Sequence, residues 1–64
     1  MLTVWEYLSN LDPAKRARLI MCKATQLQCE YAKTEMDAVD IADAIEDDMA
    51  EWFKALAKDA FGVK

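Results

Sequence analysis

The sequence is poor in the residues that most often carry catalysis or make tight turns. It contains no histidine, one glycine (Gly62), one proline (Pro13) and one serine (Ser9). The absence of histidine removes the commonest general base and the commonest zinc ligand. With a single glycine, no glycine-rich loop can hold a phosphate, and a many-stranded sheet is not expected. The sequence therefore predicts a protein that is not an enzyme and has no cofactor and no metal site.

The length and hydrophobicity of the chain predict a single small domain that needs a partner. The chain has 64 residues, and 55% of them are hydrophobic. A chain of this size buries only about 60% of the surface that its unfolded form exposes. It is therefore marginally stable unless a disulfide, a metal or a second chain contributes. We expect residues 1–64 to form one helical domain.

The charge and the N-terminal sequence bear on location and on partners. The net charge of −4 weighs against direct nucleic-acid binding through phosphate neutralisation. No stretch approaches the length of a membrane span, and the N-terminus MLTVWEYL lacks the basic start of a signal peptide. We therefore expect a cytoplasmic location and no membrane partner.

Two cysteines, Cys22 and Cys29, lie seven residues apart on one predicted helix. At about 1.5 Å of rise per residue they are roughly 10 Å apart, which is too far for a disulfide within the chain. Free cysteines usually behave as small buried apolar residues, and that is the expectation for both. A redox-sensitive role and a bridge across a dimer are the alternatives.

Local capping signals place the starts of two helices. Thr3 and Glu6 match the capping box, which predicts a short helix over residues 4–9. Asp12 is a good N-cap, and Pro13 suits the first position of a helix because its missing amide hydrogen needs no partner there. A second helix is therefore predicted to begin at Pro13.

The rest of the chain is helical in composition, with a break predicted at Thr34. No glycine or proline occurs between Pro13 and Gly62, and Thr34 could cap a new helix. The prediction is a helix over residues 13–33 and another over residues 35–61, with Gly62 as the C-terminal stop.

Charge reversal across Thr34 supports folding the chain back on itself. Residues 13–33 carry five bases and one acid, whereas residues 35–51 carry eight acids and no base. Folding back would bring Lys23 near Glu46. Each exposed pair of this kind contributes less than about 1 kcal/mol, so such pairs select the orientation of the helices. The predicted fold is all-α: a short N-terminal helix followed by a long antiparallel helical hairpin.

One continuous helix is the alternative fold. Apolar residues recur at three- and four-residue spacing straight across Thr34, until Asp48 falls among them. Such a pattern is also typical of a long helix in a coiled-coil dimer with a shift of register.

Both long helices are apolar over more than half of their circumference, which predicts self-association. A helix on a globular core needs an apolar stripe little wider than about 100°. Two wider stripes cannot both be covered within one chain, so we expect a homodimeric helix bundle. The residues predicted to mediate self-association or to bind a partner are the large apolar ones: Leu19, Tyr31, Trp52, Phe53, Leu56 and Phe61.

Four acidic residues, Asp40, Asp43, Asp47 and Glu51, recur at spacings of three and four and therefore share one helix face. A solvated face is the favoured interpretation. The alternative is an acidic decoy that imitates DNA and blocks a nucleic-acid-binding protein. A small metal-dependent helical enzyme, with magnesium held by carboxylates, is the remaining alternative.

The compact, glycine-poor and acidic helical style resembles small phage or mobile-element proteins, although no motif carries that resemblance. The sequence predicts a non-enzymatic helical protein that acts by protein–protein binding. Its expected partners are a second copy of itself and another protein, of which it would be a regulator or inhibitor.

Overall fold

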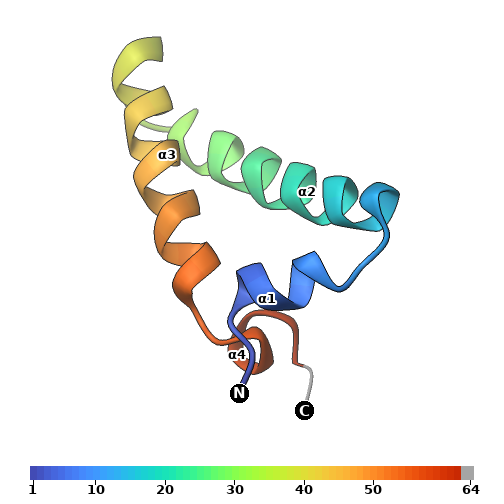
Figure 1. The fold of residues 1–64 in the computed structure, drawn as a ribbon. Coiled ribbons are helices and arrows are strands. Elements are labelled where there is room, and N and C mark those ends of the chain that lie inside the picture. Colours follow the sequence, from blue (N-terminus) through green and yellow to red (C-terminus); the bar gives the residue numbers. More distant parts are fainter. Residues whose placement is uncertain (63–64) are drawn as a thin grey trace.

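The computed structural model describes residues 1–62. Within them it has four helices: α1 (Val4–Ser9), α2 (Pro13–Tyr31), α3 (Ala38–Lys54) and α4 (Ala57–Phe61). The all-α prediction is confirmed. Figure 1 shows α1, α2 and α3 arranged as the sides of a triangle, with α4 packed beneath α1.

The first two helices begin where the sequence predicts. The Thr3 hydroxyl accepts a hydrogen bond from the Glu6 amide at 3.2 Å, and the Glu6 carboxylate accepts one from the Thr3 amide at 3.0 Å. The Asp12 carboxylate accepts from the Lys15 amide at 3.0 Å, at the start of α2. Each cap gives a partner to amide groups that have none inside their own helix.

The break between the long helices is wider than predicted, and its cap is a different residue. α2 ends at Tyr31, and the Thr34 hydroxyl donates to the Tyr31 carbonyl at 2.6 Å, which closes α2. The N-cap of α3 is Asp37, whose carboxylate accepts from the Asp40 amide at 2.9 Å. The prediction that Thr34 caps the next helix is therefore wrong. Its hydroxyl is already engaged with the helix before it.

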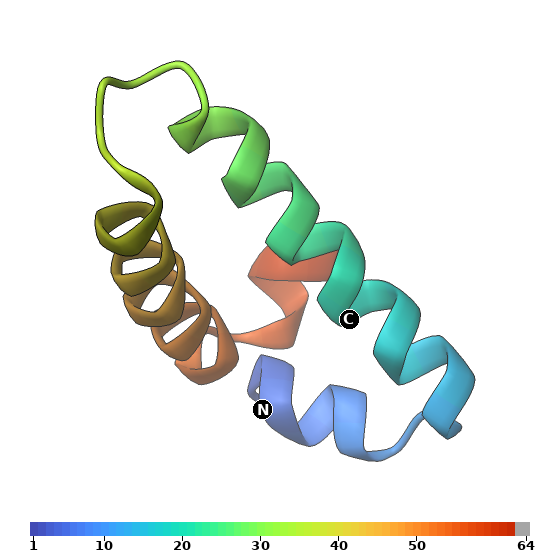
Figure 2. The ribbon, with the colours of Figure 1, turned by 90° about the horizontal axis from the view of Figure 1, so that it is seen from above.

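Neither long element keeps its predicted length. Residues 32–37 are not helical, so the predicted helix over residues 13–33 is too long. The same segment rules out a continuous helix through this region. Figure 2 shows it as the loop that joins α2 to α3.

The single helix predicted over residues 35–61 is in fact two helices. Ala55 and the residue after it are extended, with ψ angles of 161° and 134°. The Val4 amide donates to the Ala55 carbonyl at 2.8 Å, and the Ala57 amide donates to the Leu2 carbonyl at 2.9 Å. Both donors are first amides of helices, which have no partner in their own helix. These bonds from distant residues override the local helical preference.

In Figure 1 the C-terminal end of α2 lies beside α3, and the two helices diverge toward the start of α2. The Tyr31 hydroxyl donates a short hydrogen bond to the Asp48 carboxylate. The Lys23 ammonium lies 5.9 Å from the ring centroid of Trp52, within cation–π range. The polar Asp48 among apolar residues of α3 is thus explained by its bond to Tyr31.

The predicted ion pair between Lys23 and Glu46 does not form. Within residues 1–62 the one side-chain ion pair joins Lys54 and Glu51 of α3 itself, at 3.9 Å. Lys23 faces the Trp52 ring instead. Charge reversal along the chain therefore does not translate into paired charges between these helices.

The core is small. Among residues 1–62 the buried side chains are Val4 and Leu8, both fully inaccessible, together with Leu27 and Ala57. Val4 and Leu8 lie on the six-residue helix α1, whereas α3 has no buried residue. The core is therefore centred on α1, and the two long helices surround it with most of their own surface exposed.

Candidate functional site

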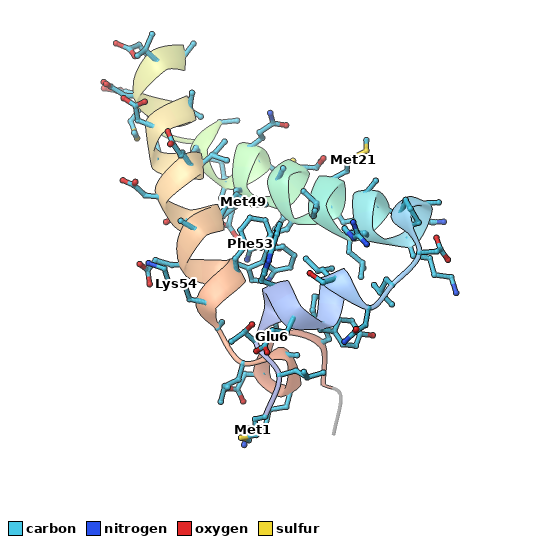
Figure 3. All side chains as sticks on the ribbon, viewed as in Figure 1. Met1, Glu6, Met21, Met49, Phe53 and Lys54 are labelled. Atoms are coloured by element: carbon cyan, nitrogen blue, oxygen red, sulfur yellow. The ribbon has the colours of Figure 1, made fainter. Side chains whose placement is uncertain are left out.

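Five aromatic rings pack together across α1, α3 and α4. The Trp5 and Phe53 rings meet edge to face at 5.1 Å between centroids, and the Tyr7 and Phe61 rings lie 4.9 Å apart. Trp52 lies 5.4 Å from Phe53 and 5.8 Å from Phe61. Figure 3 shows Phe53 pointing into the space between the helices. Pairs of this geometry contribute about 0.5–1.5 kcal/mol beyond their burial, so this cluster supports the fold.

The residues predicted to bind a partner are all partly buried within this chain. They are Leu19, Tyr31, Trp52, Phe53, Leu56 and Phe61. Three of them, Leu19, Trp52 and Phe61, line a hollow of about 200 Å³ between α2, α3 and α4. Tyr31 is bonded to Asp48, and Leu56 lies in the extended link before α4. Their role in binding a partner stays a prediction.

The large apolar side chains that face solvent are a different set. Met1 is 82% exposed, Val39 70%, Met21 68% and Trp5 54%. The others are Leu2 and Met36. In Figure 3 the Met21 side chain points away from the other helices. Sequence reasoning detected an excess of apolar surface, but it did not identify these residues as the exposed ones.

The outer face of α2 carries an open depression of about 520 Å³. We call its lining the outer stripe of α2; it consists of Ala14, Ala17, Arg18, Met21, Cys22 and Thr25. All six residues are exposed, and all belong to α2, so no second helix of this chain covers them. Cys22 and Cys29 are both free and exposed, so the expectation of buried cysteines is wrong.

Two further hollows flank the outer stripe. One, of about 270 Å³, lies between α1 and α2, and Arg18 and Leu19 are in its lining. The other is the hollow beside Trp52, to which Cys22 also contributes. The exposed side of α2 is therefore uneven along both edges of the outer stripe.

The bases of α2 differ in their roles. The Arg16 guanidinium donates to the Leu8 carbonyl at 3.0 Å and to the Leu11 carbonyl at 3.1 Å. Arg16 thus caps the C-terminal end of α1, where carbonyl groups lack helical partners. Lys15 and Arg18 are exposed and make no such contact within residues 1–62.

The four acids of the predicted decoy face, Asp40, Asp43, Asp47 and Glu51, are all exposed on α3. Ile41, on the same helix, is partly buried, as expected for a helix with one packed side and one wet side. No group of three or more metal-ligating side chains occurs within residues 1–62.

Among the side chains of residues 1–62, Glu6 and Tyr31 have shifted pKa values. Hydrogen bonds from the Thr3 amide and hydroxyl lower the pKa of the Glu6 carboxyl, because they favour its charged form. The hydrogen bond to Asp48 raises the pKa of the Tyr31 hydroxyl, and partial burial adds to this effect. Both shifts belong to groups that hold helices in place, at the start of α1 and between α2 and α3.

Comparisons of the chain with protein families, with curated proteins and with solved structures find no match. Within residues 1–62, none of the helices has the length and apolar character needed to cross a membrane.

Proposed function

We propose that this chain is a non-enzymatic, cytoplasmic helical protein that forms a homodimeric bundle and acts by binding another protein, as a regulator or inhibitor. The observation that carries the proposal is the imbalance between buried and exposed apolar side chains. Four small or aliphatic residues are buried in the described part of the chain, whereas Met1, Trp5, Met21 and Val39 are each more than half exposed. Met21 lies in the mostly apolar depression on α2, and we propose that a partner covers this surface.

The total surface supports self-association. The chain exposes 4812 Å². A compact monomer of its mass, 7.3 kDa, exposes about 4,200 Å². The surplus is thus about 600 Å², counted over polar and apolar atoms together, and it is in keeping with the proposed association.

Sedimentation over a dilution series tests this proposal. We expect a dimer at micromolar concentration and a melting temperature that rises with protein concentration, because association stabilises only the folded state. A folded monomer that melts at the same temperature over about a thousandfold range of concentration would overturn the proposal.

Trp5 is the side chain that we expect to contact the second protein. Tryptophan is enriched among the residues that dominate binding energy, and more than half of this one is exposed. A photo-crosslinking amino acid at position 5, used in the cells that make the protein, should give one discrete adduct. The matched position is Asp43 on the acidic face, where no adduct is expected. An adduct at Asp43 and none at position 5 would favour the acidic decoy instead.

The acidic decoy is the second candidate because its four carboxylates share one exposed face. Asp40 to Glu51 spans about 16 Å at 1.5 Å per residue, so one charge falls about every 5 Å. Phosphates of one DNA strand recur every 3.4 Å or so along the axis. The acidic face therefore carries fewer charges per unit length than the DNA strand that it would imitate, and for this reason we rank this function second.

Replacing Asp40, Asp43 and Asp47 together by Asn should abolish inhibition if the protein acts as an acidic decoy.

No observation within residues 1–62 favours the small metal-dependent enzyme, since no cluster of metal-ligating side chains is formed there. A rise in melting temperature on titration with magnesium would support the metal-dependent enzyme.

A further inference from the structure

Arg18 lies where two hollows of the surface meet. It lines both the depression of about 520 Å³ over the outer stripe of α2 and the hollow of about 270 Å³ between α1 and α2, which we call the α1–α2 hollow. Met21 is 68% exposed in the depression. Leu11 and Leu19, both partly buried, contribute apolar surface to the α1–α2 hollow. A positive charge therefore lies between two hollows with apolar surface.

The fold uses two of the four bases of α2. The Arg16 guanidinium donates to carbonyl groups at the end of α1, and the Lys23 ammonium lies over the Trp52 ring. The other two, Lys15 and Arg18, are exposed and make no ion pair within residues 1–62. Both of them line the α1–α2 hollow. The positive charge that α2 leaves unused is therefore gathered at one hollow.

Arg18 has no acidic neighbour on its own helix face. Residues three and four positions away along a helix share a face. Around Arg18 these positions hold Ala14, Lys15, Met21 and Cys22. Asp12 lies at the start of α2, where its carboxylate accepts from the Lys15 amide, so it offsets part of the charge of Lys15. Arg18 is therefore the base that is free to bind an acid from outside the chain.

We propose that the surface around Arg18 binds an acidic segment of a different protein, with a carboxylate on the Arg18 guanidinium and an apolar side chain in the hollow on each side. This inference rests on the proposed binding of another protein, and it names where that protein binds and what chemistry it presents. Trp5 lines neither hollow, so the contact proposed there is additional to this one.

The shape of the two hollows favours a protein segment over a small molecule. A pocket for a small molecule typically measures about 300–1,000 Å³ and encloses most of its ligand. The α1–α2 hollow is smaller than this range. The depression is lined by α2 alone, so it cannot enclose a ligand. Apolar side chains of a partner can fill shallow hollows of this kind as anchors.

The charge at the site favours a carboxylate as the bound group. A guanidinium binds a carboxylate through two parallel hydrogen bonds, a geometry that aspartate and glutamate side chains supply. A nucleic acid is disfavoured, because α2 leaves two bases free and the net charge of the whole chain is −4. The acid is therefore expected to come from a protein.

The acidic face of a second copy of this chain fits the surface less well. Among the large apolar side chains of α3, Val39 is the one that is exposed. The acids of that face can therefore bring one large apolar neighbour to a surface that has two hollows. A segment with an apolar side chain on each side of its acid fills both, and for this reason we assign the surface to a different protein.

The first experiment measures binding of defined peptides by fluorescence anisotropy. The probe is a short fluorescein-labelled peptide in which each glutamate lies between two leucines, and matched peptides carry glutamine or lysine in place of glutamate. We expect the glutamate peptide to bind at least about tenfold more tightly than the glutamine peptide. This advantage should shrink as salt is added, because exposed charges are screened. Equal affinities for the two peptides, or no binding of any peptide at about 1 mM, would overturn the inference.

The second experiment repeats the titration with variants of exposed residues. Arg18→Glu should weaken binding of the glutamate peptide by about tenfold or more and should reverse the preference in favour of the lysine peptide. Ala17→Trp fills the depression without a change of charge, so it should weaken binding of the glutamate and glutamine peptides alike. Circular dichroism shows whether each variant keeps its helices.

Lys33→Glu is the matched control for Arg18→Glu. It makes the same change of charge at an exposed position that lines neither hollow, so the affinity for the glutamate peptide should stay close to that of the wild type. An equal loss in Lys33→Glu and Arg18→Glu would mean that overall charge, and not this surface, attracts the peptide. That result would overturn the assignment to Arg18.

Sedimentation of the same variants separates this inference from the proposed homodimer. Arg18→Glu should leave self-association unchanged. If it dissociates the homodimer, a second copy occupies the surface and the assignment to a different protein is wrong. A wild type that is dimeric but binds no peptide overturns this inference alone, whereas a monomeric wild type that binds the glutamate peptide overturns the homodimer alone. Displacement of the peptide by single-stranded DNA would show that the surface binds phosphates, and it would overturn the acidic protein segment.

Discussion

Buried side chains are concentrated in the short helices of this protein rather than in the long ones. α1 and α4, of six and five residues, contain Val4, Leu8 and Ala57. α2 and α3, of 19 and 17 residues, contribute Leu27 among the described residues. Helix length is therefore a poor guide to which part of this chain holds the fold together. The long helices mainly provide outer faces.

The short and long helices differ in burial because they differ in the hydrogen bonds that hold them to the rest of the chain. α1 has a capping box at its start, the Arg16 guanidinium at its end, and backbone bonds to the segment before α4. Between α2 and α3 the side-chain hydrogen bonding consists of the Tyr31–Asp48 pair, with Lys23 resting on Trp52. Because the long helices bury little of their surface, we expect them to be the part that a partner would stabilise.

The largest expected effect comes from the core of α1. Leu8→Ala should lower the free energy of unfolding by about 2–5 kcal/mol, because Leu8 is fully buried and its removal leaves a cavity. Leu19→Ala on α2 should cost clearly less, since Leu19 is only partly buried. Urea unfolding at one fixed protein concentration measures both. If Leu19→Ala lowered the free energy of unfolding more than Leu8→Ala, the long helices would contribute more to stability than the short ones.

The next effect concerns the cap on α1. Arg16→Ala should lower the free energy of unfolding by about 1.5–3 kcal/mol, the range for hydrogen bonds to a charged group. Arg16→Lys keeps the charge but loses the fork that reaches both the Leu8 and Leu11 carbonyls, so it should recover only part of the loss. Full recovery in the same urea assay would show that charge alone is needed at this position.

A smaller effect is expected at the start of α3. Asp37→Ala should cost about 1 kcal/mol, because the Asp40 amide then loses its partner. Thr34→Ala should cost less, because Thr34 lies on an exposed loop and caps no helix start. Amide hydrogen exchange at Asp40 should accelerate only in the Asp37 variant. Faster exchange at Asp40 in the Thr34 variant instead would support the helix start at Thr34 that the sequence predicts.

The smallest effect is a dependence on pH at the contact between the long helices. The pKa of Tyr31 is raised by its bond to Asp48, so its contribution to stability is fully present below the ordinary tyrosine pKa of about 10. That contribution is lost as the pH rises through the higher pKa of the folded state. Tyr31→Phe should therefore flatten part of the alkaline fall in stability, followed by urea unfolding between about pH 9 and 11. Tyr7→Phe is the matched control, and an unchanged alkaline slope in Tyr31→Phe would contradict the role of this bond.

The starts of α1 and α2 could be predicted because their signals lie within four residues of each other. Thr3 with Glu6 and Asp12 with Pro13 act locally, and tertiary contacts do not oppose them. The cap of α3 was ambiguous because both Thr34 and Asp37 are good capping residues. Only the structure shows that the Thr34 hydroxyl serves the helix before it.

The split between α3 and α4 could not be predicted from neighbouring residues. Ala55 and Leu56 favour helix, and their extended conformation follows from backbone bonds to Leu2 and Val4. For the candidate site, the helical spacing of the four acids correctly placed them on one exposed face. The spacing could not show which side of the wide apolar surface of α2 turns outward, because α1 and α3 decide it. For that reason Met21 and Cys22 were missed as exposed residues.

The backbone bonds that join Val4 to Ala55 and Leu2 to Ala57 also constrain when the protein can fold during its synthesis. α1 is translated before the other three helices, but six residues are too few to hold a helix in water without tertiary support. Its partners are translated only after both long helices have been made. We therefore expect the core to form only after residues 55–57 have emerged, and the closure of so long a loop should slow that step.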